Sequence, residues 1–455
     1  MTQGLEIAER TLGFAGPGDD LEAVVQLEQS ALARFAGSEV HQPTIIDNCV
    51  VHVELVRDGR LGTATTNRLD ESGLAEVVQR AREAAASANA DPDFPGLAGP
   101  APVAHVDGYD DRTAALSPEE QAALATTAIG AAGHLGAYGY VTSGACELAI
   151  ASTTGVRAEQ RFTDAGVRVL AANDEISGFA EQTASAVGAI DVEATAREAV
   201  EKAERTRDAS ELEPGCYRAV LEPYALGELL QWFSYSAFNA LALLEERCAL
   251  TGRLGEPFAD AKFSLVDDAL DPSGLPKAFD FEGTPKERVA LIEDGVARGV
   301  VWDRATAARA GGGQRSTGHA LTISERSYGP VPLALAVQPG EAESTAELAE
   351  LVGEGIYITR LHYLGVVDPR AGILTGMTRD GTFRIRDRKV AEPLVNLRFT
   401  VAVPELLADL PGLTRTRSLV NQSDFYDERY PFAALVPALA TAHFTVTGTG
   451  SGPGL

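Results

Sequence analysis

Cysteine is scarce in this chain of 455 residues, and its placement argues against two kinds of site. The four cysteines, Cys49, Cys146, Cys216 and Cys248, are widely scattered and form no C-x-x-C pair. This pattern argues against a zinc ribbon and against a disulfide framework. We therefore expect reduced, buried thiols that pack as small apolar side chains.

Histidine is also scarce, and none of the seven histidines pairs with another at the H-x-x-x-H or H-E-x-x-H spacing. That spacing matters because residues i and i+4 project together from a helix, so one helix can supply two zinc ligands. A metal site would have to combine distant segments, and His319 and His362 are the candidates. The alternative for each is a polar loop residue or a buried, hydrogen-bonded imidazole.

Motifs for nucleophilic catalysis and phosphate binding are missing. The chain has no G-x-S-x-G, and none of its cysteines lies in a recognisable nucleophile motif. The glycine-rich run at 311–318, GGGQRSTG, lacks the Lys-Ser/Thr ending of a phosphate loop, so we expect a structural loop. The run VTSGACE predicts a turn between strands that holds Ser143 and Cys146, where small residues usually serve structure.

Positive charge and long apolar runs are in short supply. The chain has 38 Lys and Arg against 65 Asp and Glu, a formal net charge of -27. Nucleic-acid binding draws on clustered Lys and Arg, so we expect no nucleic-acid partner. No segment reaches the roughly 18 uncharged apolar residues of a membrane span, and the start, MTQGLEIAER, has no apolar signal region. We expect a cytoplasmic protein without a membrane partner.

The first half mixes helical and strand patterns. Alternation around Asp58-Gly59 predicts a β-hairpin, because this dipeptide suits a type I′ turn. Ser117, Pro118 and Glu120 form the signature of a capped helix N-terminus. Short β-branched runs between 139 and 173 predict an antiparallel meander. Apolar spacing predicts helices over 20–36, 71–88, 117–135 and 191–207.

The break DASELEPG, at 208–215, predicts a domain boundary near residue 212. The second half then opens with the strand CYRAVLE and one long helix over 220–246. Asp-Gly pairs at 294–295 and 380–381 predict hairpin turns between alternating runs. The fold class is therefore α+β, with an N-terminal α+β domain over 1–212 and a larger C-terminal domain over 213–455 dominated by antiparallel β-sheet.

Five segments carry a resemblance that extends in order over almost the whole chain. They are SGACELAIASTTGVRAEQRFTDAGV, AVLEPYALGELLQWFS, and the runs at 265–320, 335–394 and 430–448. Together they resemble the TldD/PmbA family, and within it the PmbA (TldE) branch. The resemblance implies an N-terminal α+β domain and a larger domain built on antiparallel sheet.

The resemblance also implies a division of labour between two subunits. A TldD-like subunit carries zinc on an H-E-x-x-x-H helix with a later cysteine as a further ligand. It pairs with a TldE-like subunit that lacks these ligands, and together they cleave unfolded peptides. This chain has no histidine on the helix after VLEP and no cysteine after Cys248, and Glu228, Gln231 and Ser234 occupy the polar face of that helix. The resemblance therefore implies a chain with no catalytic residue and no metal ligand of its own, next to zinc on a TldD-like partner.

Four residues are our candidates for a peptide cleft or an interface. Extended peptides bind strands through main-chain hydrogen bonds with little sequence preference. The strand GIYITRLHYLG, at 355–365, carries Tyr357, His362 and Tyr363, and His319 is the fourth candidate. The alternative is an ordinary core strand.

Two other functions are compatible with this sequence. Some relatives act as amide hydrolases or N-deacetylases in natural-product pathways, and a self-associating enzyme of that kind would need His319, His362 or Cys216 as its reactive group. The other possibility is an interaction module with no part in the chemical step.

Overall fold

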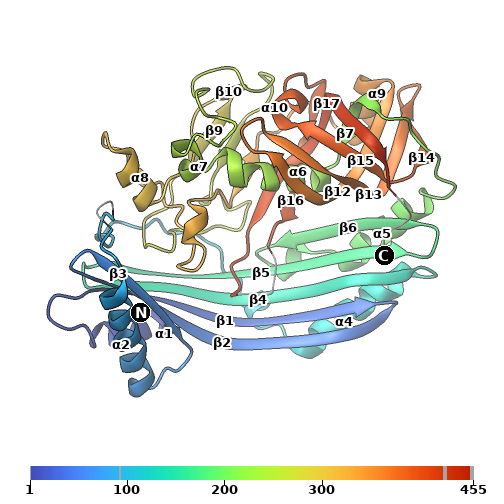
Figure 1. Cartoon of the computed structure of the whole chain (residues 1–455). Helices are drawn as coiled ribbons and strands as arrows, with labels where there is room; N and C mark the ends of the chain where they lie inside the picture. Colours follow the sequence, from blue (N-terminus) through green and yellow to red (C-terminus); the bar gives the residue numbers. More distant parts are fainter. Residues whose placement is uncertain (1, 92–93, 424–427, 451–455) are drawn as a thin grey trace.

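The computed structural model describes residues 2–91, 94–423 and 428–450 and contains two β-sheets. The first half forms a long six-stranded antiparallel sheet, which underlies the second half of the chain (Figure 1). Its strands, in the order β3-β2-β1-β4-β5-β6, are β1 (Asp20–Ala36), β2 (Glu39–Arg57), β3 (Arg60–Thr66), β4 (Gly136–Ser152), β5 (Arg157–Ala172) and β6 (Ser177–Ala184).

Helices cover one face of this first sheet. Side chains of alternate residues pack beneath α1 and α2 near one end of the strands and beneath α4 and α5 near the other. The helices of this half are α1 (Gln3–Leu12), α2 (Glu71–Ser87), α3 (Asp111–Ala114), α4 (Pro118–Ala132) and α5 (Val192–Glu204). The other face of the sheet contacts the second half, where Val24 packs with Phe279 and Phe281.

The second half forms an eleven-stranded mixed sheet in which antiparallel pairs predominate. Its strands are β7 (Gly215–Leu221), β8 (Leu265–Asp267), β9 (Val289–Glu293), β10 (Val296–Ala297), β11 (Leu335–Val337), β12 (Gly355–Asp368), β13 (Ile373–Arg386), β14 (Lys389–Leu394), β15 (Leu397–Ala402), β16 (Gly412–Asn421) and β17 (Ala433–Thr449). Its helices are α6 (Pro223–Ala237), α7 (Ala240–Leu244), α8 (Arg304–Ala310), α9 (Thr345–Val352) and α10 (Val403–Leu406). The predicted α+β class is confirmed.

Several local predictions are confirmed. The Asp58-Gly59 turn joins β2 to β3, and Asp294-Gly295 joins β9 to β10. Helix α4 begins with the predicted capping box, in which the Ser117 hydroxyl accepts a hydrogen bond from the Glu120 amide. The boundary predicted near residue 212 stays a prediction; residue 212 lies between β6, the last strand of the first sheet, and β7, the first strand of the second.

The predicted helix over 20–36 is wrong, because this segment is strand β1. The strand lies between β2 and β4, and both of its faces are covered. Ala23 and Val25 pack under the helices while Val24 faces the second half. A strand buried on both faces carries apolar residues at both parities, which imitates helical spacing.

The long helix predicted over 220–246 is two helices, and one predicted turn is a strand interior. Helix α6 ends at Ala237, and the Asn239 side chain then caps α7 by accepting from the amides of Leu241 and Ala242. Asp380-Gly381 lies within β13, and the β13–β14 turn is at 387–388. Asp380 is buried and paired with Arg360. It lies where the register of the β12–β13 pairing shifts, rather than in a turn.

Two predictions about small polar residues also need correction. Ser143 and Cys146 lie in the middle of β4, which pairs with β1 on one side and with β5 on the other, so they are not in a turn. Cys146 and Cys248 are buried as expected, but Cys216 is exposed on β7. All four thiols are free.

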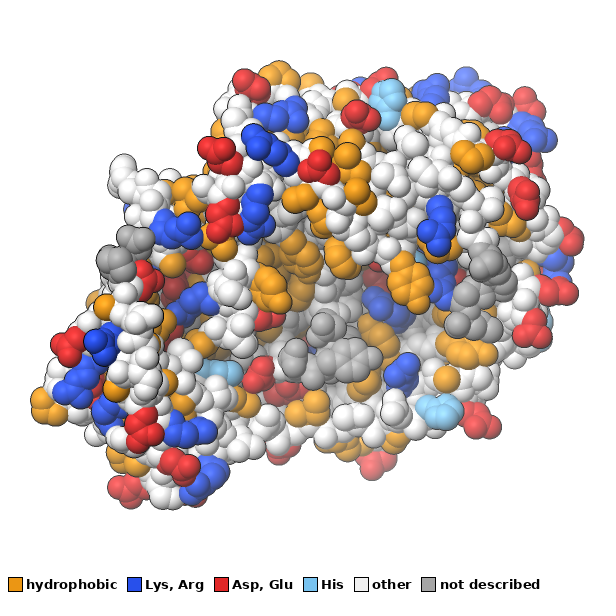
Figure 2. Space-filling model, in the orientation of Figure 1, with side chains coloured by type: hydrophobic (Ala, Val, Ile, Leu, Met, Phe, Trp, Pro, Cys, Tyr) orange, Lys and Arg blue, Asp and Glu red, His pale blue; other side chains and the backbone are white. Residues whose placement is uncertain are grey.

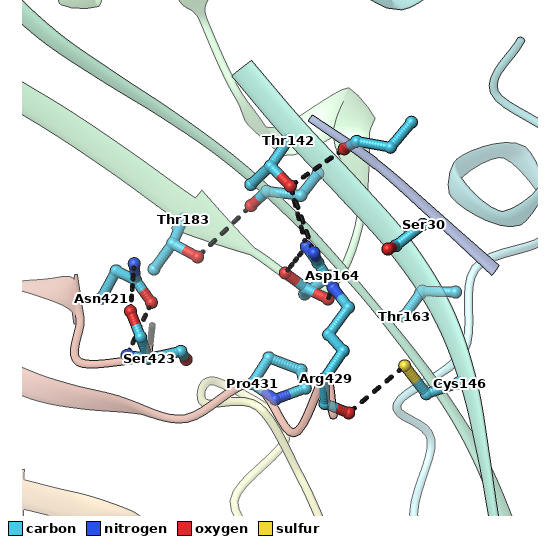
Figure 3. Close-up of polar contacts among 12 residues, drawn as sticks. Ser30, Thr142, Cys146, Thr163, Asp164, Thr183, Asn421, Ser423, Arg429 and Pro431 are labelled. Atoms are coloured by element: carbon cyan, nitrogen blue, oxygen red, sulfur yellow. Dashed lines mark hydrogen bonds and ion pairs between the residues drawn. The ribbon is translucent and has the colours of Figure 1, made fainter. Parts of the chain in front are cut away.

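Residues 428–432 precede β17, and Arg429 and Tyr430 among them pack on the first sheet. There Arg429 is buried, with its Nη2 2.6 Å from Asp164 Oδ2 and its Nε 2.7 Å from Oδ1 (Figure 3). The same guanidinium donates to Thr142 Oγ1, and the Arg429 carbonyl accepts from the Cys146 thiol. This contact fastens the two halves together. None of the helices within the described ranges is long and apolar enough to span a membrane.

Candidate functional site

His319 lies in the interior of the second half. Its side chain is fully buried, with Nε2 2.8 Å from Asp267 Oδ1 and Nδ1 2.9 Å from Thr317 Oγ1. Burial lowers the pKa of the imidazole, and the neighbouring Lys286 ammonium adds to this effect. Both ring nitrogens are occupied, so His319 is not available to a peptide or a metal in this structure. It is a buried, hydrogen-bonded imidazole, which was one of the two alternatives to a metal ligand.

Tyr357 is separated from the surface as well. It is buried in an apolar cluster under α9 with Phe383, whose ring centroid is 6.2 Å away. Its strand neighbours Ile356 and Ile358 belong to the core around α6. The beginning of β12 is therefore an ordinary core strand, which was the alternative interpretation of this segment.

His362 and Tyr363 do lie together, farther along β12. Their ring centroids are 4.1 Å apart, and Tyr363 is 77% exposed at a backbone φ of 51°. Burial lowers the pKa of His362 to about 4, and the positive charges of Arg360 and Arg379 contribute to the shift. His362 is therefore neutral at pH 7 and neighbours a group of arginines.

We call Arg168 of β5, Arg360 of β12 and Arg379 of β13 the arginine cluster. Arg360 is directly opposite Arg379 in the β12–β13 register. The guanidiniums of Arg168 and Arg360 both lie over the ring of Phe179, at 5.7 and 4.1 Å from its centroid. The cluster thus joins strands from both halves of the chain, and Figure 2 shows basic side chains along the hollow between those halves.

Two carboxylates balance part of this charge. Glu181 Oε2 is 2.7 Å from Arg168 Nη2, and Asp380 Oδ2 is 2.7 Å from Arg360 Nε. Asp380 also accepts a hydrogen bond of 2.7 Å from Ser177 Oγ, at the start of β6. Arg379 is less well paired, with its Nε 3.9 Å from Asp380 Oδ1.

The polar face of α6 adds one carboxyl group to this region. Burial raises the pKa of Glu228 to about 7, although the charges of Arg360 and Arg168 oppose the shift, while that of Glu181 adds to it. The neighbouring Gln231 amide instead donates to the Gln422 carbonyl, and the Ser234 hydroxyl donates to the Gln231 carbonyl. Glu228 is therefore the side chain on this helix face whose charge changes near neutral pH.

We expect Glu228→Gln to flatten the pH dependence of stability. The pKa of Glu228 is raised from 4.5 to about 7 in the folded state, so the folded chain holds this proton more tightly than the unfolded chain does. The resulting stabilisation is fully present below the pKa of the unfolded state and is lost as the pH rises through about 7. Glutamine keeps the neutral form at every pH. The measurement is the free energy of unfolding by urea from about pH 5 to about pH 8.5.

Glu350→Gln, at an exposed position of α9, is the control for removing one carboxylate. Its pH profile should follow that of the wild type. Identical profiles for Glu228→Gln and the wild type would contradict the raised pKa.

Comparison with known proteins assigns the chain to a family. Residues 214–448 match the PmbA/TldA metallopeptidase C-terminal domain, and residues 21–85 match PmbA/TldA metallopeptidase domain 1. The chain belongs to the PmbA/TldD family. Among curated proteins, a metalloprotease of Methanothermobacter thermautotrophicus is 28% identical over 227 residues, which cover 49% of this PmbA/TldD chain and 48% of the relative. The chain therefore spans about half the length of that relative.

Solved structures share the fold of this PmbA/TldD chain. TldE from Thermococcus kodakarensis has a TM-score of 0.85 at 19% identity and covers 97% of this chain and 99% of its own. A protein of Thermotoga maritima has a TM-score of 0.82 at 18% identity, with the same coverage. At these identities the similarity shows the fold alone.

Metallopeptidase relatives raise the question of whether zinc would fit this site. Zinc in proteins takes three or four nitrogen, sulfur or oxygen ligands. In the part of the chain that the structure describes, no group of three or more His, Cys, Asp and Glu residues could hold a metal ion. Glu228 on α6 instead lies near the guanidiniums of Arg168 and Arg360, whose positive charge repels a divalent cation. The residues around α6 therefore do not fit zinc.

Proposed function

We propose that this chain is a TldE-like subunit without zinc that, with a TldD-like zinc subunit, forms a cleft for unfolded peptides. The observation that supports this most is the composition of the α6 region. Where the metal-binding branch is expected to carry ligands, this chain has a carboxyl group beside two arginines. Such a region can orient a polar peptide but suits a cation poorly.

Exposed aromatic side chains support a binding role for the same region. Trp232 and Tyr235 on α6 are 36% and 37% exposed, and Tyr363 on β12 is more so. Tyrosine and tryptophan are enriched where proteins meet peptides or other proteins, because a rigid ring provides contact area at a low entropic cost. His362 and Tyr363 remain our candidates for this contact.

Co-expression with a TldD-like subunit tests the proposal. We expect a stable heterodimer whose cleavage of an unfolded peptide requires both chains. Trp232→Ala should raise the KM for the peptide, whereas Tyr328→Ala, at another exposed aromatic residue, should leave it unchanged. Full peptidase activity of the TldD-like subunit without this chain would contradict the proposal.

One observation favours a second function, that of a self-associating amide hydrolase. A carboxyl group with a pKa of about 7, as at Glu228, is suited to general base catalysis at neutral pH. This enzyme would purify alone as a homodimer and hydrolyse an N-acyl substrate, and Glu228→Gln would abolish that activity. A homodimer without such activity would contradict this second function and favour the role as a TldE-like subunit.

A further inference from the structure

We propose that the arginine cluster binds a carboxylate group of the peptide ligand. This inference rests on the proposed function and adds to it which chemical group of the peptide is recognised. It concerns Arg168, Arg360 and Arg379, which come from three strands and both halves of the chain.

Two of these arginines place like charges next to each other across two strands. Arg360 and Arg379 are directly opposite each other on β12 and β13. Directly opposed side chains have Cβ atoms about 4.5–5.5 Å apart, and like charges at that separation destabilise the sheet. Such a pair needs an anion beside it, and among the described residues Asp380 is the carboxylate within ion-pair distance of both arginines.

Hydrogen bonding within the arginine cluster is incomplete. The Nε groups of Arg360 and Arg379 are buried without a hydrogen bond of good geometry, and so is Asp380 Oδ2. The 2.7 Å contact between Arg360 and Asp380 is therefore an ion pair whose groups are poorly aligned. Guanidinium groups bind carboxylates most strongly through two parallel hydrogen bonds. An incoming carboxylate could supply the alignment that Asp380 does not.

Positive charge exceeds negative charge in the arginine cluster. The three guanidiniums have two carboxyl groups paired with them, Glu181 and Asp380. Burial raises the pKa of the nearby Glu228 to about 7, so Glu228 is only partly charged at pH 7. The arginines thus outnumber their two paired carboxyl groups by one, and the partly charged Glu228 offsets part of that excess, in a chain whose net charge is -27. A single carboxylate matches that excess. Polyanions such as nucleic acids are disfavoured because the surrounding surface repels them.

Access to the cluster comes from the β5 side. The Arg168 side chain is 36% exposed, whereas those of Arg360 and Arg379 are 16% and 14% exposed. Arg168 uses Nε and Nη2 for Glu181. A ligand would therefore meet Arg168 first and reach the two less exposed arginines behind it.

Fluorescence polarisation with labelled peptides tests the inference on the full-length chain. One unfolded peptide without acidic side chains is prepared as a free acid and as a C-terminal amide, and a second amidated peptide carries one internal aspartate. We expect the free acid or the aspartate peptide to bind at least about tenfold more tightly than the amide, since charge-assisted hydrogen bonds contribute about 1.5–3 kcal/mol. The preferred peptide shows whether the terminus or a side chain is recognised.

Arg379→Gln should remove this preference, because it removes one of the guanidiniums that would bind the carboxylate. Arg379 pairs only weakly with Asp380, so we expect this change to affect folding little. Arg386→Gln is the matched control, since Arg386 is an exposed arginine of the same strand, paired with Glu392. Arg360→Gln/Asp380→Asn removes the closer pair as a unit, and thermal melting reports whether each variant folds.

The outcomes separate this inference from the proposed function. Equal binding of the acid and amide peptides, or an unchanged preference in both folded variants, would overturn the carboxylate site and leave peptide binding intact. Failure of every peptide to bind, both to the chain and to its complex with a TldD-like subunit, would overturn both. Tighter binding of inorganic phosphate than of any peptide carboxylate would also overturn the inference.

Discussion

Arg429→Met lowers the free energy of unfolding by about 3–5 kcal/mol, because it leaves a buried carboxylate without its partner. The side chains of Arg429 and Asp164 are each 3% exposed, and two hydrogen bonds of 2.6 and 2.7 Å join them. Because both side chains are buried, an unpaired Asp164 would be poorly solvated. Urea unfolding followed by circular dichroism measures the loss.

A double variant distinguishes the broken pair from a general packing defect. Arg429→Met/Asp164→Leu replaces both charges with apolar groups, and buried pairs replaced in this way often lose little stability. We expect the double variant to be clearly more stable than Arg429→Met. Arg112→Met, which breaks the exposed pair with Glu120, should cost far less stability than Arg429→Met, because water screens that pair. A single variant as stable as the wild type would contradict the role of Arg429 in joining the two halves.

Gly144→Ala destabilises the fold by about 1–3 kcal/mol or more, as overpacking of a rigid interior does. A Cβ atom at Gly144 would lie 2.2 Å from Arg429 Nε and 2.5 Å from its Cδ. Arg429 cannot move aside without leaving Asp164. Thermal or urea unfolding measures the change.

Gly166→Ala is the control on the neighbouring strand β5. A Cβ atom there would find its nearest neighbours at 3.6 Å, which is ordinary contact. We expect a change within about 0.5 kcal/mol. In the Arg429→Met background, the cost of Gly144→Ala should fall, since the guanidinium that obstructs it is gone. An equal cost in both backgrounds would show that Arg429 is not the obstacle.

The sequence predicts those elements whose signals are local. The capping residues of α4 and the Asp-Gly turn of β2–β3 act on their own backbone, so neighbours in the sequence suffice to find them. Strand β1 was missed because its covering layers come from both halves of the chain. Gly144 was interpreted as a turn residue, but the space it leaves is filled by Arg429, which is 285 positions away in the sequence.

The candidate site was predicted only in part, for the same reason. Arg360 and His362 are two residues apart on one predicted strand, so their shared face could have been inferred from strand periodicity. The position of Arg379 opposite Arg360 could not have been inferred, because the turn expected at Asp380-Gly381 gives the wrong register for β13. Arg168 joins the cluster only through packing of the two halves, which spacing along the chain does not reveal.

Zinc analysis of the purified chain and of its complex with a TldD-like subunit tests the central proposal most directly. The account predicts no stoichiometric zinc in this chain alone and about one zinc per heterodimer, since each catalytic zinc needs its three protein ligands in one site. The Trp232→Ala heterodimer should keep that zinc while its KM for peptide rises. Stoichiometric zinc that survives purification of the isolated chain would contradict the account.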